Sequence, residues 1–233
     1  MTRSDKHCVT VLSGAGISAD SGLSTFRGEG GLWEGYDVRK LATPQAWNDN
    51  PERVLEFYNA RRRQVAEADP NEAHRALAKL ESTFDVVIVT QNIDDLHEQA
   101  GSSEVWHLHG DITKARSVKD PELIQHIGYK DINLGDKAED GAQLRPYVVW
   151  FGEGVHYLEN AMDSIQNSDI LVVVGTSLQI YPAAGLVDYA KQDTAKYVVD
   201  PSIPPLDDEW IRYPEKAAVG VPKLVNTLLA DEG

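Results

Sequence analysis

The side chains best suited to proton transfer lie just after a short apolar run. Residues 85–90 (DVVIVT) are rich in β-branched side chains, which is typical of a buried parallel strand. The polar segment 91–97 (QNIDDLH) follows directly, and a second polar group, 107–110 (HLHG), comes soon afterwards. Histidine exchanges a proton near neutral pH because its reference pKa is about 6.5. The pattern therefore predicts a site that combines an acid–base histidine with orienting amide and carboxyl groups.

A glycine-rich segment follows the first apolar run of the chain. Residues 8–12 (CVTVL) are predicted to form a strand, and Gly14 and Gly16 lie in the turn after it. Glycines let the backbone come close to phosphate oxygens, and a helix N-terminus offers N–H groups. Gly-x-Gly alone also fits an ordinary strand-to-helix turn, but Phe26 and Arg27 add a ring and a planar cation just beyond. The segment therefore favours a dinucleotide pyrophosphate site.

Ligands of open α/β sheets bind outside the carboxyl ends of the strands, so both segments are expected on one side. Five motifs, in order and over nearly the whole chain, resemble the motif set of the sirtuins, which are NAD-dependent lysine deacylases. They are GAGIS…SGLSTFRG from Gly14, TQNIDDLH from Thr90, HLHG from His107, VVWFGE from Val148 and VGTSLQIYPAAGLV from Val174. The resemblance implies a single catalytic domain over residues 1–233 with an α/β fold. A Rossmann-like parallel sheet flanked by helices would comprise about residues 1–30, 74–112 and 145–233, and two insertions, about 31–73 and 113–144, would form a smaller lobe.

By its place in the motif, His109 resembles the catalytic base of the sirtuins. In such an enzyme the acyl-lysine carbonyl oxygen attacks C1′ of the nicotinamide ribose of NAD, and nicotinamide leaves. The base then activates a ribose hydroxyl, which attacks the acyl carbon to form O-acyl-ADP-ribose. Asn92 would hold the ribose or an ordered water, whereas His97 and His107 fit structural roles better.

The resemblance also implies the remaining contacts to NAD. Gln91 would bond the nicotinamide ribose, Asp94 would accept from the nicotinamide amide, and Ile93 would pack beside the ring. The expected contacts on the phosphate and adenosine side are Gly14, Ala15, Gly16, Asp20, Phe26, Arg27, Gly175, Thr176, Ser177, Asp200 and Ala218. Family members commonly have Asn where this chain has Asp200. A carboxylate there accepts from both ribose hydroxyls and repels a 2′-phosphate, which favours NAD over NADP.

Two segments, 149–153 and 179–182, resemble the edges between which sirtuins bind an acyl-lysine peptide as an added strand. The expected peptide contacts are Val149, Phe151, Gly152, Glu153 and Tyr181, although at least one of Val149 and Phe151 is expected to be a core residue. Tyr58 and Arg61 share a helix face and, with the small Ala42, resemble the pocket of class III sirtuins, which remove succinyl and malonyl groups. The residues alone also fit a basic, solvated helix face with a packed tyrosine, to which Arg62 and Arg63 are assigned.

The second insertion departs from the family pattern. Most sirtuins carry two Cys-x-x-Cys pairs there that bind a structural zinc, whereas Cys8 is the only cysteine of this chain. We therefore expect no zinc, and instead an apolar cluster drawn from Leu123, Ile124, Ile127, Tyr129, Ile132, Leu134 and Leu144. The less favoured alternative is a metal held by His126 with Asp120, Asp136 and Asp140.

The composition agrees with a soluble enzyme, because 233 residues with 42% hydrophobic content supply an ample core. No apolar run approaches the roughly 18 residues of a membrane helix. With one cysteine and a polar N-terminus, a cytoplasmic location and a monomer are expected. The formal charge of −15 argues against binding to nucleic acid.

A helix is predicted from Pro51 through Ala68, with Val54, Leu55, Tyr58 and Val65 on roughly one face.

Several activities are compatible with these motifs. The favoured one is removal of succinyl and malonyl groups, and more weakly acetyl groups, from protein lysines. The alternatives are a sirtuin that prefers acetyl groups, or an NAD glycohydrolase or ADP-ribosyltransferase that uses the same site. A noncatalytic sensor of NAD or ADP-ribose would have no reason to keep Gln91, Asn92, Asp94 and His109 together.

Overall fold

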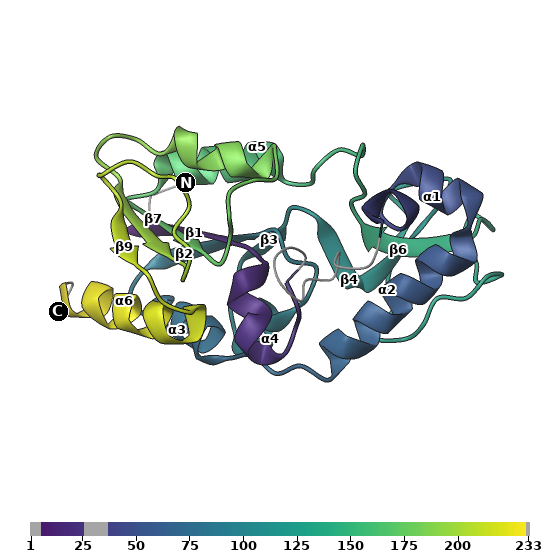
Figure 1. Ribbon diagram of the computed structural model, residues 1–233, viewed down its shortest axis with the longest axis horizontal. Coiled ribbons are helices and arrows are strands. Elements are labelled where there is room, and N and C mark those ends of the chain that lie inside the picture. The colour runs from purple at the N-terminus through teal and green to yellow at the C-terminus, as the bar shows by residue number, and fades with distance from the viewer. Residues whose placement is uncertain (1–5, 26–36, 232–233) are drawn as a thin grey trace.

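Six parallel strands form the main sheet of the computed structural model, which describes residues 6–25 and 37–231. The strands are β1 (Cys8–Ser13), β2 (Asp85–Thr90), β3 (Val105–His107), β7 (Ile170–Val174), β8 (Ala195–Val199) and β9 (Ile211–Tyr213). Their order is β3-β2-β1-β7-β8-β9, so the winding direction reverses between β1 and β7 (Figure 1). Sheets of this kind bind ligands at such a reversal, beyond the carboxyl ends of the strands. The predicted α/β class with a parallel sheet is confirmed.

Helices cover both faces of the main sheet. On one face α3 (Glu72–Leu80) and α6 (Ala217–Asp231) pack over Val9, Val11 and Val172, and on the other α5 (Leu158–Asn167) and the 3₁₀ helix η3 (Ala183–Tyr189) pack over Leu171 and Val173. The alternation of neighbouring strand residues between two apolar clusters explains why these strands are apolar throughout. A short helix, α4 (Leu96–Ala100), follows β2 and its polar segment.

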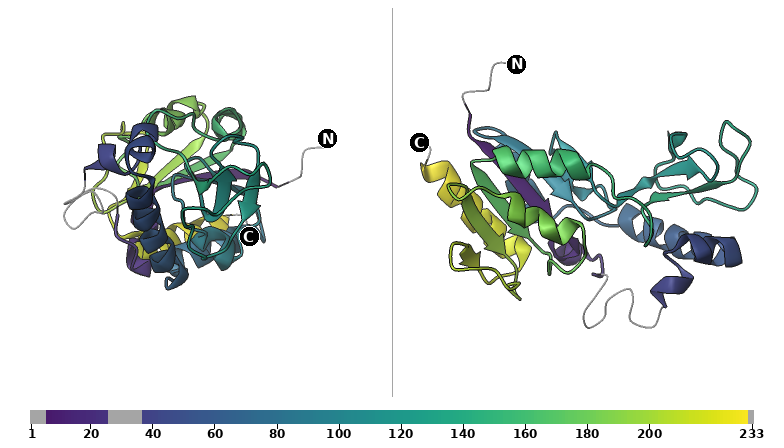
Figure 2. Two further views of the ribbon diagram at one scale, coloured as in Figure 1. Left: turned by 90° about the vertical axis from the view of Figure 1, so that its right-hand side faces the viewer. Right: turned by 90° about the horizontal axis from the view of Figure 1, so that it is seen from above.

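The smaller lobe lies beside one end of the sheet (Figure 2). It contains the 3₁₀ helix η2 (Val38–Lys40), α1 (Pro44–Asp49), α2 (Pro51–Ala66) and an antiparallel sheet of β4 (Gly110–Ser117), β5 (Ile124–His126) and β6 (Leu144–Val148), in the order β5-β4-β6. The Asn50 side chain accepts a hydrogen bond from the Arg53 amide, and Pro51 occupies the first turn. Helix α2 ends at Ala66, two residues before the predicted end, because Glu67 already forms the C-cap.

The apolar cluster of the second insertion is smaller than predicted. Ile132 and Leu144 are buried against Leu55 of α2, and Ile127 packs at the margin. In contrast, the exposed fractions are 41% for Ile124, 37% for Tyr129 and 48% for Leu134. Ile124 is exposed on the edge strand β5, and Tyr129 and Leu134 lie in the loop that follows this strand.

Arg62 does not lie on a solvated helix face, contrary to the sequence prediction. It is completely buried, and its guanidinium donates to the carbonyl of Ile112 (2.8 Å) and to Oδ1 of Asn59 (2.6 Å). Asn59 in turn exchanges two hydrogen bonds with the backbone of Ile132, at 2.9 and 3.0 Å. Burial lowers the pKa of Arg62 to about 10, so the group stays charged at neutral pH. Arg63 is exposed as predicted and pairs with Asp131.

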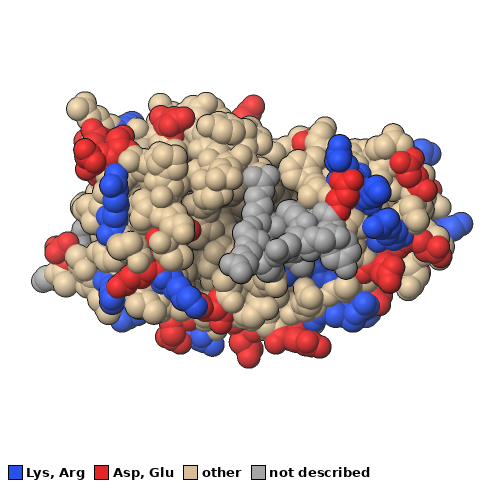
Figure 3. Space-filling view, viewed as in Figure 1, with Lys and Arg blue, Asp and Glu red and all other residues tan. Residues whose placement is uncertain are grey.

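Acidic and basic side chains are interspersed over the small lobe on the face drawn in Figure 3. Counted over the whole sequence, 37 acidic residues outnumber 22 basic ones. Among the helices of residues 6–25 and 37–231, none is both long and apolar enough to span a membrane.

Candidate active site

A cavity of about 800 Å³ opens at the carboxyl ends of β1, β2, β7 and β8 and extends between the two lobes. Most of the predicted site residues line it. They are Gly14, Ala15, Gly16, Asp20, Ala42, Tyr58, Gln91, Asn92, Ile93, His109, Val149, Phe151, Gly152, Glu153, Gly175, Thr176, Ser177, Tyr181 and Asp200. Phe26 and Arg27 lie outside the described residues. The sheet reversal therefore brings together segments that are far apart in the sequence.

The glycines at the end of β1 serve a close approach between two loops. The Gly14 amide donates to Val174 (3.0 Å), and the Gly16 amide donates to Gly175 (2.8 Å). A Cβ atom on Gly14 or Gly16 would lie 2.7 Å from backbone atoms of Gly175, and Gly175 itself has a φ of +64°. The N–H groups of Gly14 and Gly16 are thus bonded to protein carbonyls. The segment after them, η1 (Ala15–Ser21), is a 3₁₀ helix rather than an α-helix.

His109 lies in the cavity wall between β3 and β4. Its Nδ1 is 2.9 Å from the carbonyl oxygen of Gln91, to which it donates, so the neutral ring has Nε2 as its proton acceptor. Burial lowers the pKa of His109, and the bond to Gln91 only partly opposes this effect. The neutral form, which a base requires, is therefore favoured at neutral pH.

Asn92 and Asp94 are joined by a serine that the sequence analysis did not single out. The Asn92 amide donates to Ser18 Oγ (3.0 Å), and Ser18 Oγ donates to Asp94 Oδ2 (3.1 Å). All three side chains are buried, and burial raises the pKa of Asp94. Asp94 is not among the described residues that line the cavity. The position of Ser18 within the glycine-rich motif was the one signal that could have indicated it.

Gln91 and Asp200 line the cavity directly after β2 and β8. The Gln91 side chain donates to Thr176 Oγ1 at 3.0 Å. Burial raises the pKa of the Asp200 carboxyl, whose Oδ1 accepts from the Ser202 amide. Ala218, the second residue of α6, does not line the cavity. The preceding Ala217 and Lys216 line it instead, and Lys216 pairs with Asp20 at 3.3 Å.

The segment 149–153 forms one wall of the cavity without being a strand. Phe151 is 47% exposed and Val149 is half-buried, whereas their neighbours Val148 and Trp150 are in the core. The expectation that at least one of Val149 and Phe151 is a core residue was therefore wrong. Glu153 faces the interior with both oxygens occupied, because it accepts from the Trp150 amide (2.8 Å) and pairs with Arg145 (2.7 Å) and Arg116 (3.0 Å).

The three residues predicted to recognise the acyl group lie at different depths. Ala42 and Tyr58 are buried in the cavity wall, and burial raises the pKa of Tyr58. Arg61 is 4% exposed. It does not belong to the described residues that line the cavity. Its guanidinium donates to Gln64 Oε1 and to the Ser24 carbonyl, both at 3.3 Å. Tyr58 and Arg61 thus share the buried side of α2.

Comparisons with known proteins agree with this geometry. The Sir2 family model matches residues 14–182. An NAD-dependent protein deacylase of Helicobacter pylori (strain J99 / ATCC 700824) is 54% identical over 193 residues, which cover 83% of this chain and 82% of that protein. An NAD-dependent protein deacylase of Bacteroides thetaiotaomicron is 48% identical over 209 residues, covering 88% of each chain.

Solved structures show the same fold. A Sir2 homologue in complex with NAD superimposes with a TM-score of 0.88 at 36% identity, over 98% of this chain and 92% of that one. A Sir2 protein bound to a propionylated peptide gives a TM-score of 0.77 at 26% identity, over 97% and 94% of the two chains. The chain therefore belongs to the Sir2 family, the sirtuins.

Proposed function

We propose that the chain is an NAD-dependent protein-lysine deacylase that removes succinyl and malonyl groups in preference to acetyl groups. The activity follows from the family and from the relatives, which are NAD-dependent protein deacylases. The observation that carries it in this chain is His109, a half-buried neutral histidine in the wall of a cavity at the sheet reversal. A ribose hydroxyl that loses its proton to Nε2 becomes the nucleophile toward the acyl carbon.

The cavity suits NAD as co-substrate. Gly14, Gly16 and Gly175 line the cavity where two loops pack closely together, so a pyrophosphate can lie against side-chain-free backbone there. Asp200 supplies a carboxylate for the adenosine ribose, and Asn92 is fixed in place by Ser18 for the nicotinamide ribose. NAD supplies the nicotinamide leaving group and the ribose that accepts the acyl group. We further propose that an acylated peptide binds between segments 149–153 and 179–182, which both line the cavity.

The acyl preference rests on Ala42, Tyr58 and Arg61. The small side chain of Ala42 leaves room in the wall, and Tyr58 brings a hydroxyl group to it. Two of the Arg61 hydrogen bonds, both at 3.3 Å, have uncharged acceptors, and the buried Asp94 lies near enough for its charge to act on the guanidinium. A carboxylate is a stronger acceptor that can engage the guanidinium in two parallel bonds. We infer that a succinyl or malonyl carboxylate exchanges for these contacts when the acyl chain enters from the cavity.

Replacing Arg61 by methionine is expected to lower kcat/KM for a succinylated peptide at least tenfold more than for an acetylated peptide. The reason is that a hydrogen-bonded charge pair contributes about 1.5–3 kcal/mol. The measurement is a competition between equal amounts of both peptides with NAD, followed by mass spectrometry of all products. Arg63→Met, which removes an exposed arginine of the same helix, is the control. Equal losses of kcat/KM on both peptides would reject Arg61 as the residue that determines the acyl preference. Release of free ADP-ribose with both peptides intact would reject deacylation as the activity.

We also propose that the second insertion is held without zinc. It carries no cysteine, and within the described segments no group of three or more His, Cys, Asp or Glu side chains is arranged to hold a metal ion. The hydrogen bonds of Asn59 to Ile132 join this insertion to α2, and Arg62 holds the Asn59 side chain in place. The Ile132 and Leu144 side chains pack against Leu55.

Elemental analysis of the purified protein is expected to give far less than one zinc per chain, and a chelator is expected to leave the melting temperature unchanged. Both results follow if the insertion is stabilised by the Asn59 and Arg62 hydrogen bonds and by apolar packing alone. Stoichiometric zinc that is lost together with stability on chelation would contradict the proposal.

A further inference from the structure

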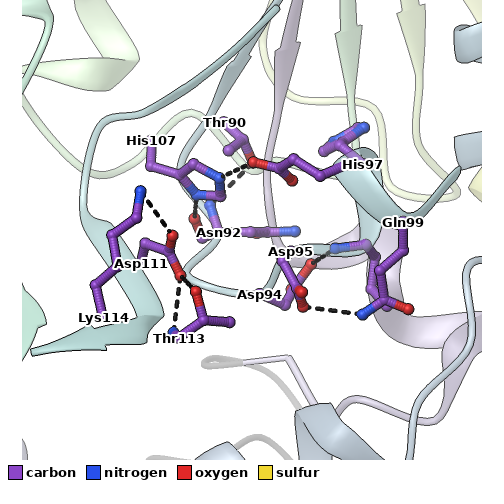
Figure 4. Close-up of polar contacts among 12 residues, drawn as sticks. Thr90, Asn92, Asp94, Asp95, His97, Gln99, His107, Asp111, Thr113 and Lys114 are labelled. Carbon is purple, nitrogen blue, oxygen red and sulfur yellow. Dashed lines mark hydrogen bonds and ion pairs between the residues drawn. The ribbon is translucent and has the colours of Figure 1, made fainter. Parts of the chain in front are cut away.

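The ring of His107 is held between two acceptors at the edge of the proposed nicotinamide site. Its Nδ1 is 2.9 Å from the carbonyl oxygen of Asn92, and its Nε2 is 2.8 Å from Oε1 of Glu98 on α4. Figure 4 shows the ring pointing at Asn92 from above the polar segment that follows β2. A carbonyl and a carboxylate can only accept, so both ring nitrogens must carry a proton to satisfy both contacts. The geometry is that of a buried imidazolium.

His109, two residues further on, makes a matching contact with the other carbonyl of the same turn. Its Nδ1 donates to Gln91 at 2.9 Å, as that of His107 does to Asn92. Two histidines thus hold two consecutive carbonyl groups. They differ in what faces Nε2: a carboxylate for His107 and the cavity for His109. One ring is therefore suited to carry a fixed charge and the other to accept a proton.

We propose that His107 is a positioning residue that is a cation at neutral pH: it fixes the Asn92 backbone, and with it the Asn92 side chain, only while both of its nitrogens are protonated. Glu98, outside the cavity, is what keeps it protonated. The inference rests on the proposed role of Asn92 at the nicotinamide ribose. It predicts that activity falls at high pH because His107 loses its charge, independently of the base His109.

The groups around His107 fit this assignment. Burial would lower the pKa of His107, but the hydrogen bond and charge of Glu98 outweigh it, with smaller help from Asp111, so that the pKa is raised. Asp111 is itself paired with Lys114 at 3.1 Å and accepts from Thr113 (Figure 4). The buried His97 repels the charge weakly and has its own pKa lowered by burial, and Asp94 lies near enough for His107 to lower its pKa in part.

The test is Glu98→Gln, which keeps an acceptor for Nε2 but removes the charge. Removal of an adjacent opposite charge lowers a histidine pKa by about one unit or more. The ratio of mutant to wild-type kcat/KM for NAD should therefore fall about tenfold between pH 6 and pH 8.5. Glu104→Gln is the matched control, because it removes an exposed carboxylate before β3 that has no contact with His107. Its ratio should stay constant with pH.

A histidine NMR titration measures the same property without any substrate. The chain has seven histidines, and the signal missing from His107→Gln identifies His107. We expect this signal to titrate above pH 6.5 in the wild type and at lower pH in Glu98→Gln. A His107 signal that titrates below pH 6.5 in the wild type would overturn the proposal. So would an activity ratio for Glu98→Gln that does not change with pH. A third outcome is that the His107 signal titrates as expected but the protein has no deacylase activity. This outcome would reject the proposed function and leave the charged state of His107 established.

Discussion

Replacement of His109 by alanine is expected to lower kcat/KM for deacylation by about two to four orders of magnitude, the usual contribution of a general base. The side chain is the described histidine that lines the cavity, and its Nδ1–H bond to Gln91 fixes Nε2 as the accepting nitrogen. The loss of this neutral hydrogen bond costs only about 1 kcal/mol of stability, so the variant should fold. The measurement is steady-state turnover with an acylated peptide, together with NAD binding by calorimetry.

His156→Ala is the control for this experiment. His156 is also half-buried, stacks on Tyr147 with ring centroids 5.0 Å apart, and lies close enough to His109 to influence its pKa. It is not among the described residues of the cavity wall, so its loss should change turnover by less than tenfold. A His109→Ala variant that binds NAD and keeps a tenth or more of the wild-type turnover would refute the assignment.

The acid limb of the pH profile follows from the same residue. A base works only when neutral, and burial lowers the pKa of His109 below its usual 6.5. Activity should therefore persist below pH 6.5 and be lost as the pH falls through the lowered pKa.

Strands were more predictable from the sequence than the helices that surround them. The run 85–90 coincides with β2 and the run 8–12 falls within β1, because a strand buried on both faces must be apolar throughout. Helix α5 and strand β9 gave no comparably clear pattern, and the edge strand β5 is exposed at all three positions. Exposed elements are fixed by their neighbours rather than by their own periodicity.

The polar residues of the site were found by motif, but their partners were not. Ser18 and Arg62 look like ordinary surface residues in the sequence, and only the three-dimensional arrangement shows that both are buried and hydrogen-bonded. The contact between the loops of Gly14 and Gly16 and of Gly175 could not be predicted for a similar reason. The acceptors of the two amides, Val174 and Gly175, lie at the end of β7 and just after it, about 160 residues away, and nothing local indicates that the two loops touch.

Replacement of Arg145 by methionine is expected to lower the free energy of unfolding by about 3–5 kcal/mol. The reason is that the variant removes one partner of a buried ion pair and leaves the other behind. Arg145 is 5% exposed, and its guanidinium donates to both carboxylate oxygens of Glu153, at 2.7 and 3.0 Å. The guanidinium carbon also lies 3.2 Å from the centroid of the Trp150 ring. Urea denaturation measures the loss. Arg63→Met breaks an exposed pair with Asp131 and should cost less than about 1 kcal/mol.

The same variant separates stability from substrate binding. Glu153 and Trp150 shape the wall formed by residues 149–153, so loosening them should raise KM for the peptide more than KM for NAD. The double variant Arg145→Met with Glu153→Leu removes both charges. It should recover part of the lost stability, since the carboxylate that the single variant leaves with Arg116 as its remaining ion-pair partner is then gone. Equal destabilisation by Arg145→Met and Arg63→Met would show that the ion pair at this wall contributes no more than a surface contact.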